Sequence, residues 1–182
     1  MKKLLLSVTL ITVGFCNAQF GTNIPTTKIG SENSKWTFGG NAGLGGAFGS
    51  NGGGTTIYIT PRVGYKIMEN MEAGLAGNLS WSNSKYFSST TVGVGPFANY
   101  YFGRSFFASS MLQEFFFNQK DKYNNFKYSG NETALHIGGG YMQKMGQHTY
   151  MQIGGMYNVL YNSNKSVFGG AFVPNIGIVY GL

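Results

Sequence analysis

The sequence predicts an all-β fold, an eight-stranded antiparallel up-and-down transmembrane β-barrel, and three observations support this prediction. Apolar residues alternate with polar or small ones in eight segments that follow Lys35. Only 10% of the 182 residues are charged, whereas 16% are aromatic and 29 are glycine, unlike an average soluble domain. The connections between segments alternate between tight and long, as they do in exported barrels.

The N-terminus predicts export. Lys2 and Lys3 precede the apolar run Leu4–Phe15, and the small residues that follow offer a cleavage site after Ala18. This is the pattern of a signal peptide, residues 1–18, and the apolar run is too short to cross a membrane as a helix. Cleavage would remove the only cysteine, so the mature chain would have no thiol or disulfide chemistry.

The rest of the chain predicts one domain behind a short leader. Residues 19–34 are polar and without period, which predicts a flexible N-terminal leader, and residues 35–182 form the predicted barrel. A lipid anchor at Cys16 is the alternative for the N-terminus, but Phe15 is too bulky for that processing site.

The first four segments predict strands with one apolar face each. Their apolar positions are Trp36, Phe38, Ala42, Leu44 and Phe48; Ile57, Ile59, Val63, Tyr65 and Ile67; Met71, Ala73, Leu75, Leu79 and Trp81; and Val92, Val94, Pro96, Ala98, Tyr100 and Phe102. A tight turn at Glu69–Asn70 separates the second segment from the third. Because successive side chains of a strand point to opposite faces, each segment predicts one face toward lipid and one toward a lumen.

The last four segments complete the predicted barrel. The fifth, residues 106–119, leaves its phase open because phenylalanine occurs on both of its faces. The apolar positions of the remaining three are Leu135, Ile137 and Tyr141; Met151, Ile153, Tyr157, Val159 and Tyr161; and Phe168, Phe172, Ile176, Ile178, Tyr180 and Leu182. Pro61, Pro96 and Pro174 fall inside strands, where each removes one ladder hydrogen bond, and therefore predict bulges or positions near a rim.

The apolar faces predict contact with lipid because they carry no charge. A lysine or arginine on the lipid face near the middle of the bilayer costs about 2–4 kcal/mol. The residues expected in a structural polar network inside the lumen are Arg62, Lys66, Glu72, Glu114, Glu132, His136 and Lys144. Glu114 is assigned to the lumen by the same charge rule. Lys66 and Glu72 lie symmetrically about the turn at Glu69, so we expect a structural ion pair between them, with an ion path as the alternative.

The connections and the aromatic residues predict the two ends of the barrel. Tight connections fall at 68–70, 103–105 and 146–148, and longer ones fall at 50–54, 83–89, 120–131 and 162–166. Aromatic residues gather at the tight-turn end at Trp36, Phe38, Tyr65, Tyr100, Phe102, Tyr141 and Tyr180, and at the other end at Trp81, Phe115, Phe117, Tyr161 and Phe168. Exported barrels have short periplasmic turns, longer outer loops and aromatic girdles at both interfaces.

These features together resemble a small eight-stranded outer-membrane β-barrel of the OmpA/OmpX-like porin family, over residues 35–182. The resemblance implies the cell outer membrane of a Gram-negative bacterium, insertion by the outer-membrane assembly machinery, and no cofactor. Barrels of this family usually end in an aromatic residue, whereas this chain ends in Leu182, so Tyr180 is expected to serve as the assembly signal.

One motif suggests a different function. The stretch from Gly93 to Ala98 fits the G-x-G-x-x-G/A pattern of a dinucleotide-binding turn. That turn needs a following helix and an acidic residue about 20 residues further on, whereas the alternation continues through Phe102 and no acidic residue occurs between Glu72 and Glu114. The motif is therefore interpreted as part of a membrane strand.

The residues with catalytic potential are few. His136 and Glu114 are expected to be cross-strand neighbours if the loop between their segments is centred near Asn125, and Ser109 and Ser110 lie in the same region. A serine, histidine and carboxylate could serve acyl transfer, as in a lipid-modifying barrel enzyme, but no hydrolase motif surrounds the serines. A structural hydrogen bond in the lumen is the favoured interpretation, and no cluster has the spacing of metal ligands.

The predicted function is non-enzymatic and concerns the cell surface. The predicted outer loops carry a basic rim made of Lys85, Lys120, Lys122, Lys127 and Lys165. Contact of this rim with phosphates of outer-leaflet lipopolysaccharide is favoured over nucleic-acid binding, because the lysines are scattered and the compartment is wrong, while a solvated rim without a partner stays open. A monomer is expected. The alternatives are a narrow porin for small solutes, a lipid-modifying enzyme around His136, and a soluble secreted β-barrel binder.

Overall fold

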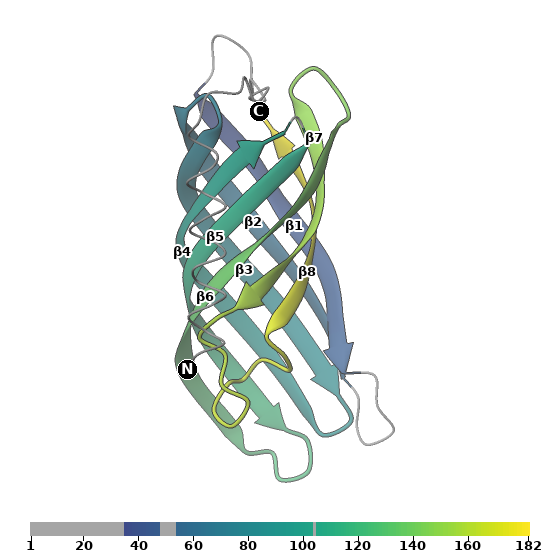
Figure 1. The fold of residues 1–182 in the computed structure, drawn as a ribbon. Coiled ribbons are helices and arrows are strands. Elements are labelled where there is room, and N and C mark those ends of the chain that lie inside the picture. The colour runs from purple at the N-terminus through teal and green to yellow at the C-terminus, as the bar shows by residue number, and fades with distance from the viewer. Residues whose placement is uncertain (1–34, 48–53, 104) are drawn as a thin grey trace, which may run out of the picture.

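The computed structural model describes residues 35–47, 54–103 and 105–182 and confirms the predicted fold (Figure 1). The strands are β1 (Trp36–Ala47), β2 (Gly54–Met68), β3 (Met71–Ser84), β4 (Phe87–Phe102), β5 (Phe106–Asp121), β6 (Lys127–Lys144), β7 (Thr149–Asn158) and β8 (Phe172–Tyr180). They form a closed barrel in chain order. Within the described ranges no helix is long and apolar enough to cross a membrane. The predicted signal peptide, the leader and Phe48 lie outside the described residues.

The barrel closes between its first and last strands. Phe38 of β1 lies opposite Tyr180 of β8, and this antiparallel pairing continues to Ala42 opposite Ile176. Because the eight described strands close on one another, their backbone groups bond within the sheet. A sheet in a hydrocarbon environment needs this closure, since lipid offers no hydrogen-bond partners to an open edge.

Side chains separate by parity into an apolar outer face and a lumen face that carries polar and apolar residues, as predicted for every strand except β5. On the outer face Leu44 is 71% exposed and Leu75 is 63% exposed, whereas Glu72 and Gln152 in the lumen are fully buried. A barrel in water would bury its large apolar side chains, so this inverted distribution is that of a membrane-spanning barrel. The alternative of a soluble binder does not agree with this outer face.

Aromatic rings surround the end of the barrel at which β2–β3, β4–β5 and β6–β7 turn, which we call the tight-turn end. In Figure 1 this end is uppermost, next to the C-terminus. The rings in contact are Trp36 with Tyr65 (centroids 5.3 Å apart), Tyr100 with Phe102 (6.2 Å), Phe102 with Phe106 (6.0 Å) and Phe106 with Tyr141 (5.8 Å). This belt matches the girdle predicted for this end.

Two connections at the opposite end, which we call the loop end, are shorter than predicted. The predicted loop 83–89 is a tight turn at Lys85 and Tyr86, where the Ser84 hydroxyl accepts hydrogen bonds from the N–H groups of Tyr86 and Phe87, each 3.1 Å long. The predicted loop 120–131 is mostly strand, because β5 and β6 pair up to Lys120 opposite Lys127. This hairpin turns at 122–126, with Asn125 in the left-handed region at φ 55°.

The last connection is longer than predicted. β7 ends at Asn158, short of the predicted Tyr161, and residues 159–171 form the link to β8. Phe168, which was predicted on the apolar face of the last strand and in the girdle, lies in this link instead.

The structure decides the phase of β5, which the sequence left open. The odd-numbered residues face the lumen, so Phe115 and Phe117 are buried while Phe116 is exposed. The prediction that Phe115 and Phe117 belong to the outer girdle is therefore wrong. Glycines on the neighbouring strands provide the space, since a Cβ at Gly93 would lie 2.7 Å from the Phe115 ring and a Cβ at Gly130 would lie 2.9 Å from the Phe117 ring.

The three strand prolines do not create bulges. Ladder pairs are skipped at Pro61 between β2 and β3 and at Pro96 between β4 and β5, but the register on either side is unchanged. Pro174 lies opposite Gly155 within a continuous ladder. A register shift occurs instead in β2–β3, between Lys66 and Met68. Of the two predicted settings, bulges or positions near a rim, the bulges are wrong, and only Pro174, the third residue of β8, lies near a strand end.

The C-terminal residue also differs from its prediction. Gly181 adopts φ 90°, a conformation that favours glycine, and its N–H donates a 2.8 Å hydrogen bond to the His148 carbonyl. This turn directs Leu182 inward, where it is only 1% exposed, so the expected outer-face position is wrong. Tyr180 remains on the outer face, 57% exposed.

Candidate functional site

The lumen is filled with apolar side chains at the tight-turn end. The buried cluster there is Tyr101, Phe107, Met142, Tyr150, Val179 and Leu182. A second buried cluster lies further toward the loop end and consists of Ala76, Phe97, Met111 and Met156. Side chains of an eight-stranded barrel are long enough to meet across its interior, so these clusters occupy the lumen in the way a protein core does.

A buried ion pair connects the two clusters. Arg62 Nη2 of β2 lies 3.4 Å from Glu72 Oε1 of β3, and the two side chains are 3% and 0% exposed. Asn99 Nδ2 and the Tyr101 hydroxyl each donate a 2.7 Å hydrogen bond to the same carboxylate oxygen. On the other side, Arg62 Nη2 donates a 3.0 Å hydrogen bond to Gln152 Oε1 of β7. The pair therefore links β2, β3, β4 and β7 across the lumen.

The buried network around Arg62 and Glu72 contains different residues from the lumen network that the sequence predicted. The register places Lys66 opposite Glu72, as predicted, but the ion pair of Glu72 is made with Arg62, whose guanidinium also lies 5.2 Å from the centre of the Phe97 ring. Lys144 is exposed at the end of β6 and so lies outside the buried network. The sequence prediction missed Asn99, Tyr101 and Gln152, although all three are polar residues at inward positions.

Glu114 lies on the outer face of the barrel, so its assignment to the lumen is wrong. Because β5 turns its odd residues inward, Glu114 points outward and accepts hydrogen bonds from Asn131 Nδ2, at 2.6 Å, and from the Thr133 hydroxyl. His136 faces the lumen opposite Met111. Glu114 and His136 are therefore on opposite faces of the sheet, and the arrangement expected for acyl transfer is not formed.

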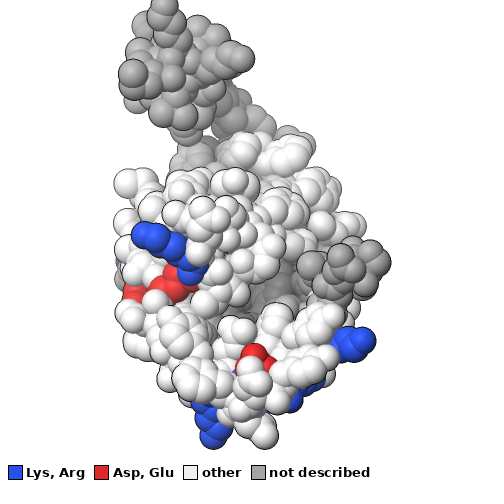
Figure 2. All heavy atoms as spheres, turned by 90° about the horizontal axis from the view of Figure 1, so that it is seen from below, with Lys and Arg blue, Asp and Glu red and all other residues white. Residues whose placement is uncertain are grey.

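A cavity of about 680 Å³ occupies the loop-end half of the lumen. Hydroxyl and amide side chains from β2, β3 and β4 line one wall, namely Thr56, Thr60, Asn78, Ser80, Ser82, Ser89 and Thr91. Apolar side chains and an imidazole line the facing wall, namely Met111, Phe115, His136, Met156, Val167 and Phe168. Figure 2 shows the loop end from below, with a hollow between the charged side chains of the rim.

The link between β7 and β8 folds over the mouth of this cavity and is held by Glu132. Glu132 Oε1 accepts a 2.6 Å hydrogen bond from the Ser166 hydroxyl, and Oε2 accepts a 2.8 Å hydrogen bond from the Val167 N–H. The Phe168 ring packs edge-on against Phe115, with centroids 4.9 Å apart. Glu132 is thus on the lumen face, as predicted, but its carboxylate fixes the link between β7 and β8, whereas the buried ion pair is formed by Arg62 and Glu72.

Replacing Glu132 by alanine should free the link between β7 and β8. Hydrogen bonds to a charged group contribute about 1.5–3 kcal/mol, so amide exchange at Val167 should become roughly 10- to 100-fold faster. Hydrogen exchange measured by NMR on the folded barrel tests this expectation. Glu114→Ala is the control, because it removes a carboxylate of the adjacent strand that does not contact this link; equal acceleration in both variants would contradict the role assigned to Glu132.

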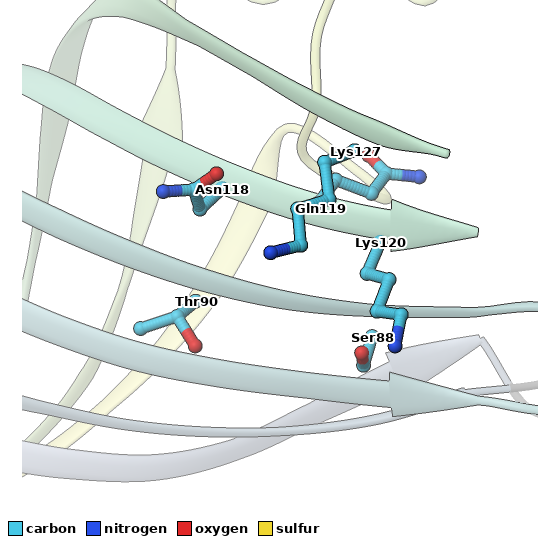
Figure 3. Close-up of a pocket in the computed structure, with 6 residues that line it drawn as sticks. All are labelled: Ser88, Thr90, Asn118, Gln119, Lys120 and Lys127. Carbon is cyan, nitrogen blue, oxygen red and sulfur yellow. The ribbon is translucent and has the colours of Figure 1, made fainter. Parts of the chain in front are cut away.

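A shallow pocket of about 240 Å³ lies at the loop end of β4, β5 and β6 (Figure 3). It is lined by Ser88, Thr90, Asn118, Gln119, Lys120 and Lys127. The register places Ser88, Lys120 and Lys127 side by side on three adjacent strands, and Thr90 opposite Asn118. Two lysines that lie directly opposite each other repel, so this pocket is electrostatically suited to an anion.

The other lysines of the predicted rim also lie at the loop end. Lys85 is exposed on the β3–β4 turn, and Lys165 is exposed in the link between β7 and β8. Lys122 Nζ donates 2.7 Å hydrogen bonds to Asn83 Oδ1 and to the Ser84 carbonyl, which ties the β5–β6 hairpin to its neighbour. The structure therefore gathers the five lysines at one end, with Lys120 and Lys127 in strands and the others in turns or loops.

Metal ligands are not grouped in the part of the chain that the structure describes. No set of three or more histidine, cysteine, aspartate or glutamate side chains lies close enough together there to hold a metal ion.

Comparisons with known proteins support the fold. No family model matches the chain, and no curated protein matches it. Among solved structures, the crystal structure of Neisserial surface protein A (NspA) is similar at 11% sequence identity and a TM-score of 0.52, over 82% of this chain and 98% of that chain. The translocator domain of the autotransporter NalP from Neisseria meningitidis also aligns, at 11% identity, over 100% of this chain and 96% of that chain, but its TM-score of 0.39 is too low to support an argument. The first likeness shows a shared barrel fold.

Proposed function

We propose that this protein is a non-enzymatic outer-membrane β-barrel whose basic rim contacts lipopolysaccharide phosphates, and that Lys120 and Lys127 make the principal contact. The observation that carries this proposal is the placement of these two lysines directly opposite each other on the outer face, beside the hydroxyl of Ser88. Like charges in this position destabilise a sheet, and a bound phosphate would convert their repulsion into two charge-assisted hydrogen bonds.

The height of the pocket fits a lipid headgroup. Phe116 is the last large apolar side chain on the outer face of β5 and is 55% exposed. Lys120 lies four positions beyond it, which is about 13 Å along a strand and roughly 10 Å in height at the usual strand tilt. The flexible lysine stem can reach back over part of that distance, so its ammonium group is placed near the phosphates at the edge of the hydrocarbon layer.

The location in the outer membrane is supported by the fold and by the sequence. The similar structure bears the name of a surface protein. The N-terminal signal pattern would provide export, and Tyr180, on the outer face of the last strand, is the residue we propose for recognition by the assembly machinery. In this arrangement the tight-turn end faces the periplasm and the loop end faces the exterior.

The other candidate functions receive less support. A porin needs a continuous path, whereas buried side chains occupy the lumen between the cavity and the tight-turn end. An acyl-transfer enzyme around His136 lacks its carboxylate partner, since Glu114 faces outward. The closed barrel does not need a second copy to complete its sheet, which supports a monomer.

The double variant Lys120→Gln/Lys127→Gln should bind lipid A about 30-fold more weakly than the unmodified barrel. Each lysine near an anionic membrane surface contributes on the order of 1 kcal/mol, and 1.4 kcal/mol corresponds to tenfold in affinity. The measurement is a titration of the barrel, in zwitterionic micelles, with lipid A and with lipid A from which both phosphates have been removed.

The matched control is Lys85→Gln/Lys165→Gln, which removes the same charge from turns at the same end. This control should change the affinity less than about threefold, because neither Lys85 nor Lys165 lines the pocket and exposed charges are screened by salt. Equal losses in both double variants would show an unspecific effect of net charge. Unchanged affinity of the unmodified barrel after removal of the phosphates would overturn the proposal.

A further inference from the structure

The cavity in the loop-end half of the lumen is not used by the proposed contact with lipopolysaccharide. Its volume of about 680 Å³ lies within the range of pockets that bind small molecules. Among the described residues that line it, none is lysine, arginine, aspartate or glutamate. An ionised ligand would lose its hydration there without gaining a counter-charge, so the cavity favours a neutral ligand.

The two walls of the cavity have different chemistry. The wall formed by β2, β3 and β4 presents hydroxyl and amide groups, and two pairs of them already bond to each other. Thr56 Oγ1 lies 2.7 Å from Ser82 Oγ, and Asn78 Nδ2 donates a 3.0 Å hydrogen bond to Thr60 Oγ1. These groups exchange partners at little cost, because a hydroxyl both donates and accepts.

The facing wall offers aromatic and thioether surface, interrupted by the amides of Gln113 and Gln119. Phe115 is in edge-on contact with Phe168, at 4.9 Å between centroids, and with the imidazole of His136, at 6.1 Å. Met111 and Met156 continue this surface toward the floor of the cavity. A ligand that fills the cavity therefore needs an apolar face on this side.

Two asparagines that line the cavity each have a side-chain oxygen without a hydrogen-bond donor. Asn41 of β1 and Asn175 of β8 are 7% and 5% exposed, and the carboxamide oxygen of each is buried without a hydrogen-bond partner. Buried oxygens without a donor are uncommon in folded proteins, since each costs free energy. Because both residues line the cavity, rotation of either carboxamide would turn its oxygen toward a ligand hydroxyl, which would then satisfy it.

We infer that this cavity binds a short neutral saccharide from the outer side of the membrane. A sugar ring presents C–H groups on its faces and hydroxyl groups around its edge, which matches the aromatic wall, the hydroxyl wall and the free carboxamide oxygens. The link held by Glu132 lies over the mouth, so Ser166, Val167 and Phe168 close the site above the ligand. An acyl chain would match the aromatic wall but would offer no hydrogen bond to the hydroxyl wall or to the asparagine oxygens.

The two described histidines allow ligand binding in the cavity to be measured directly. His136 lines the cavity, whereas His148 lies at the tight-turn end, with its ring 6.5 Å from that of Tyr180. The experiment records imidazole ring NMR signals of the full chain in phosphatidylcholine nanodiscs, which contain no sugar detergent, during titration with maltose and with sucrose. The expected result is a saturable shift of the His136 signals with at least one disaccharide and no shift of the His148 signals.

A matched pair of variants tests the location. Ser82→Phe fills the cavity from the hydroxyl wall and should weaken binding at least tenfold, while Ser110→Phe makes the same change on the exposed outer face and should leave binding intact. Asn175→Ala, which removes an oxygen without a partner, should weaken binding about 3- to 10-fold even if Ser82→Phe fails to fold. Absence of a saturable His136 shift with the disaccharides overturns the inference, as does a shift produced by decane but not by sugar.

Discussion

Replacing Glu72 by alanine should lower the free energy of unfolding of the barrel by about 3–5 kcal/mol. The substitution leaves the Arg62 guanidinium, 3% exposed at its side chain, without the carboxylate that lies 3.4 Å away. It also leaves Asn99 Nδ2 and the Tyr101 hydroxyl without the oxygen to which both donate. A buried charge without a partner keeps the full cost of its lost hydration, which is why breaking such a pair costs more than the pair itself contributes.

The measurement is equilibrium unfolding in urea, followed by tryptophan fluorescence of the barrel in lipid vesicles. Glu69→Ala is the matched control, because Glu69 is an exposed carboxylate on the adjacent turn, and it should change the stability by less than about 0.5 kcal/mol. The double variant Arg62→Met/Glu72→Met should recover much of the loss, since replacing a whole buried pair by apolar side chains is often close to neutral. A loss below about 1 kcal/mol for Glu72→Ala would contradict this account of the lumen.

Replacing Gly95 by alanine should destabilise the barrel by about 3 kcal/mol, at the upper end of the usual cost of overpacking. A Cβ at this position would lie 1.9 Å from the Leu112 carbonyl oxygen and 2.8 Å from Gln113 Cα. Both atoms belong to the backbone of β5, so the methyl group can be accommodated only if the strands move apart. The ladder between β4 and β5 also skips its pairs at Gly95 and Pro96, so this close approach lies at an irregular point of the sheet.

Gly77→Ala is the matched control for this second prediction. Gly77 lies on the neighbouring strand β3, and the nearest atom to its added Cβ would be Pro61 Cγ at 3.6 Å, an ordinary contact distance. The control should leave the urea midpoint unchanged or raise it slightly, because alanine loses less backbone entropy on folding than glycine. Similar losses for the two variants would mean that general glycine content, rather than the close approach at Gly95, determines stability.

The fold could be predicted in detail because the membrane constrains the outer face of every strand. On β2, the residues Ile57, Ile59 and Val63 face outward and Thr60 and Arg62 face inward, as the alternation alone indicated. A lysine or arginine on the lipid face costs about 2–4 kcal/mol near the middle of the bilayer, so a strand such as β2, with Arg62 on one face and apolar residues on the other, is stable in only one orientation. The tight turns at Asn70 and near Gly103 were also predicted correctly, because the alternation of apolar and polar residues changes phase at these two positions.

The candidate site was predictable only in part. Arg62, Glu72, Glu132 and His136 lie on the lumen face that their parity indicated, but parity did not identify the partners of these side chains. Glu72 forms its ion pair with Arg62, four residues before the predicted partner Lys66. Glu132 accepts a hydrogen bond from the Val167 N–H, which lies in a connection longer than predicted. Alternation determines which face a side chain occupies, whereas the height of that side chain against its neighbours depends on the register between strands.

The sequence by itself determined the number of strands, their order along the chain and the lipid-facing side of seven of them, because a period of two next to lipid is a local property. Only the tertiary structure decided the phase of β5, and with it the outward position of Glu114. The reason is that phenylalanine suits both lipid and a packed lumen, so the segment alone favours neither face. The space inside the barrel determines the phase of β5, because Gly93 and Gly130 on the neighbouring strands leave room for the rings of Phe115 and Phe117.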